Sequence, residues 1–139
     1  MGEWQIASGG SVPDNAFRAG SDGSPVYVIR AWHEGDLLPG KLASGSAYVP
    51  YGGAEIKKDD YEVLVGSNYS WVGHHPSAPL PGNAVPGGQT SSGETLYIAH
   101  VSIDGVDVIG KVHFSHGKAY IPYFGKELSY ENFEILVRN

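Results

Sequence analysis

The chain contains an internal repeat that extends over its whole length. The segment GKLASGSAYVPYGGAEIKKDDYEVLV (residues 40–65) returns near the C-terminus as GKVHFSHGKAYIPYFGKELSYENFEILV (residues 110–137). Repeated units of this kind bury their hydrophobic faces by packing against one another. The sequence of 139 residues therefore predicts two similar units, residues 1–66 and 67–139, that pack into one body.

Each repeat has the pattern of β-strands separated by tight turns. The runs PVYVIRAW and TLYIAHVSI are rich in β-branched and aromatic residues, and YEVLV and FEILV alternate between apolar and polar positions. Both features are typical of strands. Twenty glycines and nine prolines supply turns, and no window keeps the spacing of an amphipathic helix. We predict an all-β fold of two antiparallel units related by a pseudo-two-fold axis and built from the tandem repeat.

The composition argues against several classes of partner. Nine Lys and Arg residues and fifteen Asp and Glu residues give a formal net charge of −6, so we expect neither a nucleic-acid groove nor attraction to anionic membranes. No segment has the length and hydropathy of a membrane span, so membrane insertion is not expected. The N-terminus does not resemble a signal peptide. We expect a protein that is cytoplasmic or unconventionally secreted.

The usual signatures of catalysis and of metal binding are weak. The chain has no Cys and no serine in a nucleophile elbow. The close histidine pairs, His74–His75 and His113–His116, fall on predicted strands, where residues one or three apart point to opposite faces. We therefore predict no metal site, no cofactor and no enzymatic activity. A glycosidase-like pair of carboxylates stays open as an alternative, because the first repeat carries many acidic residues.

A Gly-Lys pair recurs at the same point of both repeats. Lys41 and Lys111 each follow a glycine, which we expect to form a tight turn. The loop with Ser21-Asp22 aligns with the loop that holds Gln89-Thr90, and the hairpin geometry predicts that each loop lies beside a Gly-Lys turn. The candidate binding residues are Asp22, Lys41, Lys111, Thr90, Gln89 and Asp36, of which Asp36 is a weaker candidate for the pocket of Asp22 and Lys41.

A carboxylate and an ammonium group in one pocket suit a neutral, polyhydroxylated ligand. The carboxylate accepts hydrogen bonds from two neighbouring hydroxyls, and the lysine donates to hydroxyl or ring oxygens. Hydrogen bonds to charged groups contribute about 1.5–3 kcal/mol each, so a few of them suffice for specific binding of a sugar. Nine Tyr and three Trp offer aromatic surface for the apolar side of a sugar ring.

These motifs resemble a known family. The repeated pattern G-K … A-Y-[VI]-P-Y-x-G-x-E … [YF]-E-[VI]-L-V is similar to the DM-nine repeat, also called natterin-like. The short two-repeat layout, with VPDNAFRAGSD in the first copy, resembles the small mannose-binding lectins of bivalve molluscs within that family.

The resemblance implies an all-β homodimer that recognises mannose and high-mannose glycans without a metal ion, as a pattern-recognition protein of innate immunity. It places the sugar-contacting acid on Asp22 and the lysines on Lys41 and Lys111. The second repeat has Thr90 where the first has Asp22, so its site lacks the matching carboxylate. Two other readings stay open: a structural or protein-interaction repeat module without sugar binding, and a carbohydrate-active enzyme.

Overall fold

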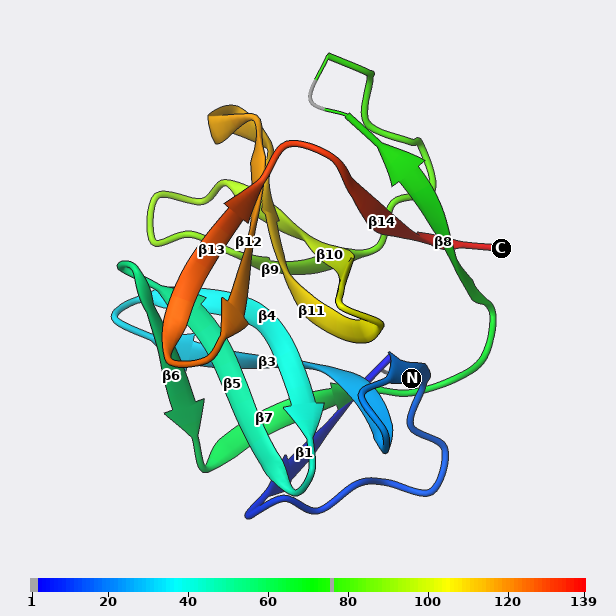
Figure 1. Cartoon of the computed structure of the whole chain (residues 1–139), viewed down its shortest axis with the longest axis vertical. Helices are drawn as coiled ribbons and strands as arrows, with labels where there is room; N and C mark the ends of the chain where they lie inside the picture. The colour runs from blue at the N-terminus through cyan, green and yellow to red at the C-terminus, as the bar shows by residue number, and fades with distance from the viewer. Residues whose placement is uncertain (1–2, 76) are drawn as a thin grey trace.

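The computed structural model describes residues 3–75 and 77–139, which form fourteen strands and one short 3₁₀ helix (Figure 1). The first repeat forms β1 (Trp4–Ser8), β2 (Arg18–Ser21), β3 (Pro25–His33), β4 (Asp36–Ala43), β5 (Ser46–Tyr51), β6 (Ala54–Lys58) and β7 (Asp60–Leu64). The second forms β8 (Tyr69–His74), β9 (Pro86–Gln89), β10 (Thr95–Ile103), β11 (Val106–His113), η1 (Phe114–His116), β12 (Lys118–Tyr123), β13 (Lys126–Tyr130) and β14 (Phe133–Arg138). The predicted all-β fold is confirmed. No helix in the described residues has the length and hydropathy needed to cross a membrane.

The strands of the two repeats follow one another in equivalent order from the two ends of the sheet. It runs β1-β7-β3-β4-β5-β6-β13-β12-β11-β10-β14-β8, with β2 added to β3 and β9 added to β10. Each strand of the first repeat on this path therefore has a counterpart with equivalent neighbours in the second, whereas β9 differs from β2 in that it also pairs with β4 of the other repeat. In Figure 1 strands β3 to β7 lie in the lower half of the molecule and β10 to β14 in the upper half.

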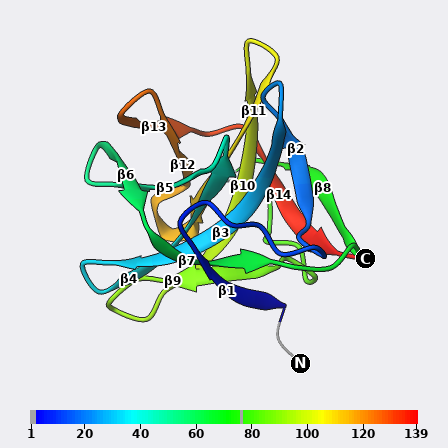
Figure 2. The same ribbon diagram turned by 90° about the horizontal axis from the view of Figure 1, so that it is seen from below.

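The two repeats reach into one another through their hairpin tips. The β3–β4 tip lies against the loop after β9, where the Ser91 N–H donates to Asp36 Oδ1 over 2.8 Å. In the same way the Ser21 N–H donates to Asp107 Oδ2 of the β10–β11 tip over 2.8 Å. Figure 2 shows the corresponding course of the backbone, with the tips of β2 and β11 side by side and the β3–β4 tip beside the β9 loop. A pocket near either tip therefore draws residues from both repeats.

The hydrophobic core is shared as well. One cluster joins the fully buried Val26 and Val28 of β3 to Ile98 of β10 and Ile109 of β11. Burying one such side chain contributes about 1.5–3 kcal/mol. Separating the repeats would expose this cluster, so they form one cooperative unit.

Gly40 and Gly110 do not form turns, and this prediction was wrong. Both lie inside long strands, β4 and β11. A Cβ atom at Gly40 would lie 2.1 Å from the carbonyl oxygen of Tyr48, and one at Gly110 would lie 2.1 Å from that of Tyr120. The neighbouring strand thus passes so close that only glycine fits. This close approach is the reason that a glycine precedes the lysine in each repeat.

Replacing Gly110 by alanine is therefore expected to lower the free energy of unfolding by at least about 1–3 kcal/mol, the usual cost of overpacking. Urea denaturation measures the effect. Gly73→Ala in β8 is the matched control, because a Cβ atom there meets no atom within 4 Å. Equal stability of the two variants would show that the sheet accommodates the added methyl group.

Candidate functional site

Two equivalent pockets lie where the repeats meet, and each is lined by both of them. The first pocket, of about 350 Å³, is lined by Asp22, Lys41, Ala43, Ser44, Tyr48 and Glu55 of the first repeat and by Val106, Asp107, Tyr123 and Phe124 of the second. The second pocket, of about 330 Å³, is lined by Asp36, Tyr51 and Gly52 of the first repeat and by Thr90, Leu96, Lys111, His113, His116, Tyr120 and Glu127 of the second. Volumes of this size are at the lower end for small-molecule sites.

A lysine–glutamate ion pair forms the base of each pocket. Lys41 Nζ lies 3.3 Å from Glu55 Oε2, and Lys111 Nζ lies 3.2 Å from Glu127 Oε2. The side chains of these four residues are only 8–13% exposed. Desolvation is costly for charges this deeply buried, so each needs its partner.

Each of these glutamates also holds a backbone amide of the other repeat. Glu55 Oε1 accepts a hydrogen bond from the Gly125 N–H, and Glu127 Oε1 accepts one from the Gly53 N–H, both over 2.9 Å. The backbones of the same two turns are hydrogen-bonded to one another as well. The ion pairs are therefore fixed by the contact between the repeats.

Tyrosine rings flank the lysine of each pocket. Lys41 Nζ lies 5.6 Å from the ring centroids of both Tyr48 and Tyr123. Lys111 Nζ lies 5.7 Å from the centroid of Tyr51 and 5.4 Å from that of Tyr120. These distances fall within the range of cation–π attraction. In each pocket one tyrosine comes from each repeat.

The rim of the first pocket is acidic. Asp22 follows β2 and closes a short turn, since the Ser24 N–H donates to its Oδ1 over 3.2 Å. Asp107 accepts from the Ser21 N–H, and His100 Nε2 lies 2.7 Å from its Oδ1. Burial raises the pKa of Asp107, but the hydrogen bonds from His100 and Ser21 and the positive charge of His100 outweigh it, so its pKa lies below the ordinary value. Asp107 is thus an ionised acceptor at neutral pH.

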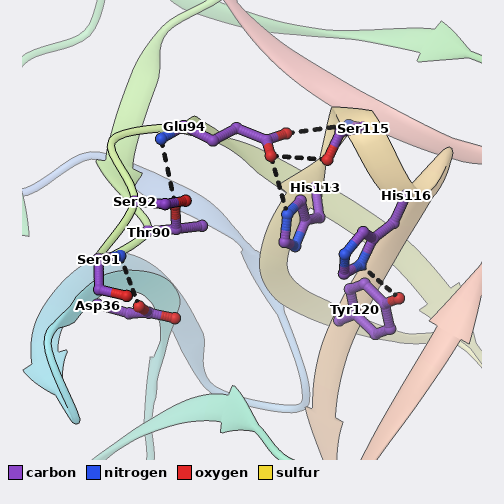
Figure 3. A network of polar contacts seen from close by, with 9 residues as sticks. All are labelled: Asp36, Thr90, Ser91, Ser92, Glu94, His113, Ser115, His116 and Tyr120. Carbon is purple, nitrogen blue, oxygen red and sulfur yellow. Dashed lines mark hydrogen bonds and ion pairs between the residues drawn. The ribbon is translucent and has the colours of Figure 1, made fainter.

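The rim of the second pocket has a different set of polar groups (Figure 3). Thr90 Oγ1 accepts from the Glu94 N–H over 3.1 Å, and Asp36 contributes the one carboxylate that the first repeat adds to this pocket. The side chain of Glu94 is held by Ser115, whose hydroxyl donates to it over 2.6 Å.

Two histidines stack on one another in the second pocket. The rings of His113 and His116 are 3.5 Å apart between centroids and nearly parallel. His113 Nε2 lies 3.1 Å from Glu94 Oε1, and His116 Nδ1 lies 3.0 Å from the Tyr120 hydroxyl (Figure 3). The prediction that these histidines point to opposite faces was wrong, because β11 ends at His113 and the following η1 turns His116 back over His113.

We expect the free energy of unfolding to fall as the pH is lowered below about 6.5, the ordinary pKa of histidine. Burial lowers the pKa of His113, and His116 and Lys111 lower it further against the opposing effect of Glu94. The unfolded chain then binds a proton that the folded protein does not bind. The folded protein is therefore more stable above this pH and loses stability below it. Urea denaturation between pH 7 and pH 5 measures the slope. His113→Asn is expected to flatten it, and an unchanged slope would contradict this assignment.

The structure distributes the predicted site residues over both pockets. Asp22 and Lys41 line the first pocket together, and Lys111, Thr90 and Asp36 line the second. Asp36 therefore does not share a pocket with Asp22, because the β3–β4 hairpin extends across to the second repeat. Gln89 lies in β9 and is exposed, and it lines neither pocket.

Sequence reasoning missed several lining residues. Glu55 and Glu127 occupy equivalent positions in Y-x-P-Y-x-G-x-E, as do Tyr48 and Tyr120. Lys41 and Lys111 were singled out because the same residue stands at equivalent positions of both repeats. The same criterion would have singled out these glutamates and tyrosines. Asp107 had no such signal, because Leu37 stands at its equivalent position.

The donor set of the pockets suits hydroxyl groups. No group of three or more His, Cys, Asp or Glu side chains suitable for a metal ion occurs within residues 3–75 and 77–139. The first pocket instead offers fixed carboxylates and one ammonium group over aromatic walls. A ligand hydroxyl both donates and accepts, so it can bridge such groups.

The fold and the pockets define the class of protein: it is an all-β protein of two interlocked repeats with a pair of equivalent pockets. The DM9 repeat model matches residues 20–130, more than half of the chain. The chain is therefore a member of the DM9 repeat family, as the resemblance predicted.

Natterin-4 and a nematode motility protein are among the known proteins to which the chain is similar. Natterin-4 of Thalassophryne nattereri is 26% identical over 145 residues, which cover 96% of this chain and 33% of natterin-4. The chain thus spans about a third of the length of this relative. The nematode sperm cell motility protein MFP2B has the same fold, with a TM-score of 0.74 at 19% identity over all of this chain and 46% of that protein. At that level of identity, the likeness concerns the fold alone.

Proposed function

We propose that this protein is a metal-independent lectin that binds mannose and the mannose residues of high-mannose glycans. The observation that carries the proposal is the repeated pocket, in which a buried Lys–Glu pair lies between two tyrosine rings. Similarity to the mannose-binding members of the DM9 family supports the choice of sugar.

The first pocket is the stronger site in this proposal. Asp22 accepts hydrogen bonds from two neighbouring hydroxyls of the sugar, and Lys41 donates to a third oxygen. Both residues line that pocket. Hydrogen bonds to charged groups contribute about 1.5–3 kcal/mol each. The second pocket has Thr90 in place of Asp22 but gains Asp36 from the other repeat, so it binds the same class of ligand more weakly.

We further propose a homodimer that acts in pattern recognition of microbial glycans, within the cytoplasm or after unconventional secretion. A dimer would present four pockets on one particle. Several weak sites that engage one glycan surface raise the overall affinity by roughly 10²–10⁴-fold. Light scattering tests the dimer, and a monomer at working concentration would restrict avidity to the two pockets of one chain.

Calorimetric titration with mannose, in the presence and absence of a chelator, tests the proposed function. We expect saturable binding that the chelator leaves unchanged, and weaker binding of galactose. Loss of binding with the chelator and its return with calcium would contradict metal independence. Absence of saturable binding for mannose and for a high-mannose glycan alike would contradict the lectin function.

One observation favours a second candidate, a protein-interaction module. A groove of about 530 Å³ is lined mainly by residues of β3, β7 and the end of β6, and its wall includes Trp32, 58% exposed, and Ile6 of β1, 82% exposed. Exposed apolar surface beside charged residues is common in protein interfaces.

The third candidate is a carbohydrate-active enzyme. Neither the DM9 family nor this fold is typical of enzymes, and a glycosidase assay on the same preparation tests this candidate.

A further inference from the structure

The turn at the mouth of the first pocket has a bulky residue where the backbone favours glycine. Phe124 has a φ of +49° and Gly125 a φ of +80°, and the equivalent turn of the first repeat has Gly52 at +60° and Gly53 at +86°. Positive φ at two successive positions characterises the type I′ hairpin turn, which prefers Asn-Gly or Gly-Gly. A bulky residue is an outlier in this conformation. The other non-glycine residues found there are polar: Glu34, Ser44 and Asp104.

Core packing does not account for Phe124. The residue is 83% exposed, and its ring lies 4.5 Å from that of Tyr123, measured between centroids, at an angle of 58°. An exposed apolar side chain on a strained backbone gives little stability to the fold. Strained positions of this kind cluster at ligand sites, and Phe124 does line the first pocket, together with Asp22 and Lys41.

We infer that Phe124 is a specificity-determining residue of the first pocket, where its ring stacks on the apolar face of a hexopyranose. The inference rests on the proposed sugar binding and identifies the ligand class as rigid ring sugars. One face of a pyranose presents several C–H groups, which pack well on an aromatic ring, while the hydroxyls point toward charged groups. The pocket has this arrangement, with Lys41 and Glu55 at its base and Phe124 at its rim.

The second pocket provides an internal comparison. Gly52 stands at the position of Phe124, so that pocket has no ring at this point of its rim. The first pocket is therefore expected to distinguish mannose from mannitol, an acyclic polyol with comparable hydroxyls but no rigid apolar face. The second pocket is expected to distinguish them less.

The test uses Phe124→Gly, which copies the turn of the first repeat, and follows binding by amide NMR shifts. The Ser21 N–H donates to Asp107 of the first pocket, and the Ser91 N–H donates to Asp36 of the second, so each amide reports on one pocket. The affinity for mannose at the Ser21 reporter is expected to fall about 3–10-fold, the amount that an aromatic contact contributes. The affinity for mannitol is expected to stay unchanged, and so is the affinity for mannose that the Ser91 amide reports.

Thermal stability separates this role from a structural one. The melting temperature of Phe124→Gly is expected to stay the same or rise, because glycine adopts the left-handed turn without strain. Phe124→Asn, which tolerates this conformation and lacks the ring, is expected to bind as the glycine variant does, whereas Phe124→Tyr is expected to retain binding.

Three results would overturn the inference, and a fourth would refute the proposed function. Equal loss of mannose and mannitol affinity with a lower melting temperature would make Phe124 a structural residue. Dissociation of a dimer with unchanged affinity at Ser21 would make it a contact to a second copy of the chain. No shift of either reporter with mannose in the unmodified protein would refute the proposed function itself, whereas normal binding by Phe124→Gly would refute only the inference.

Discussion

Replacing Glu127 by alanine is expected to lower the free energy of unfolding by about 3–5 kcal/mol, the usual cost of breaking a buried ion pair. Lys111 is only 6% exposed and would lose its carboxylate partner, while the Gly53 N–H would lose its acceptor. Lys111 would keep its hydrogen bond to the Pro50 carbonyl, at 3.0 Å, and its contacts with the rings of Tyr51 and Tyr120, but none of these groups carries a neutralising charge. Urea denaturation at pH 7 measures the loss.

Two controls make this result specific. Removing both charges in the double variant Lys111→Met/Glu127→Leu is expected to cost much less than Glu127→Ala alone, because no unpaired charge stays buried. Glu3→Ala breaks the exposed pair with Arg138, and the expected effect is about 0–1 kcal/mol. A cost of Glu127→Ala no greater than that of Glu3→Ala would contradict a stabilising role of the buried ion pair.

Replacing Asp22 by asparagine is expected to weaken mannose binding at the first pocket about 30–100-fold, or about 2–3 kcal/mol. The substitution removes a charged acceptor and keeps the oxygen to which the Ser24 N–H donates, so the turn after β2 is preserved. Calorimetry gives the total affinity, and the Ser21 amide assigns the change to the first pocket.

Asp14→Asn is the matched control, because Asp14 is exposed and lines neither pocket. Lys41→Ala is less informative than the sequence suggested. It would leave Glu55 without its cation, so the variant is expected to lose stability as well as affinity. Full mannose affinity in Asp22→Asn would reduce the role of Asp22 to that of a turn residue.

The fold was largely predictable, because strands and repeats are local features of a sequence. The runs around Tyr27 and Tyr97 became β3 and β10, and YEVLV and FEILV became β7 and β14. The Gly-Lys prediction failed for a physical reason. Glycine serves both tight turns and close strand contacts, and only the three-dimensional pairing shows that Gly40 lies against the carbonyl of Tyr48.

The candidate site was predictable only in part. Equivalent positions of the repeats indicated Lys41 and Lys111, and the structure places them in equivalent pockets. Aligning the repeats treats each one as separate, so it gave no sign that Asp36 and Asp107 extend into pockets of the other repeat. These contacts depend on how the hairpin tips interlock, which is a property of the tertiary structure.

The most direct test is a crystal structure of the protein soaked with mannose. We expect a mannose ring in the first pocket, with hydroxyls on Asp22 and Lys41 and one face against an aromatic ring, and weaker density beside Lys111. A sugar bound elsewhere, or both pockets free of sugar at a saturating concentration, would contradict the central claim that these pockets are the binding sites.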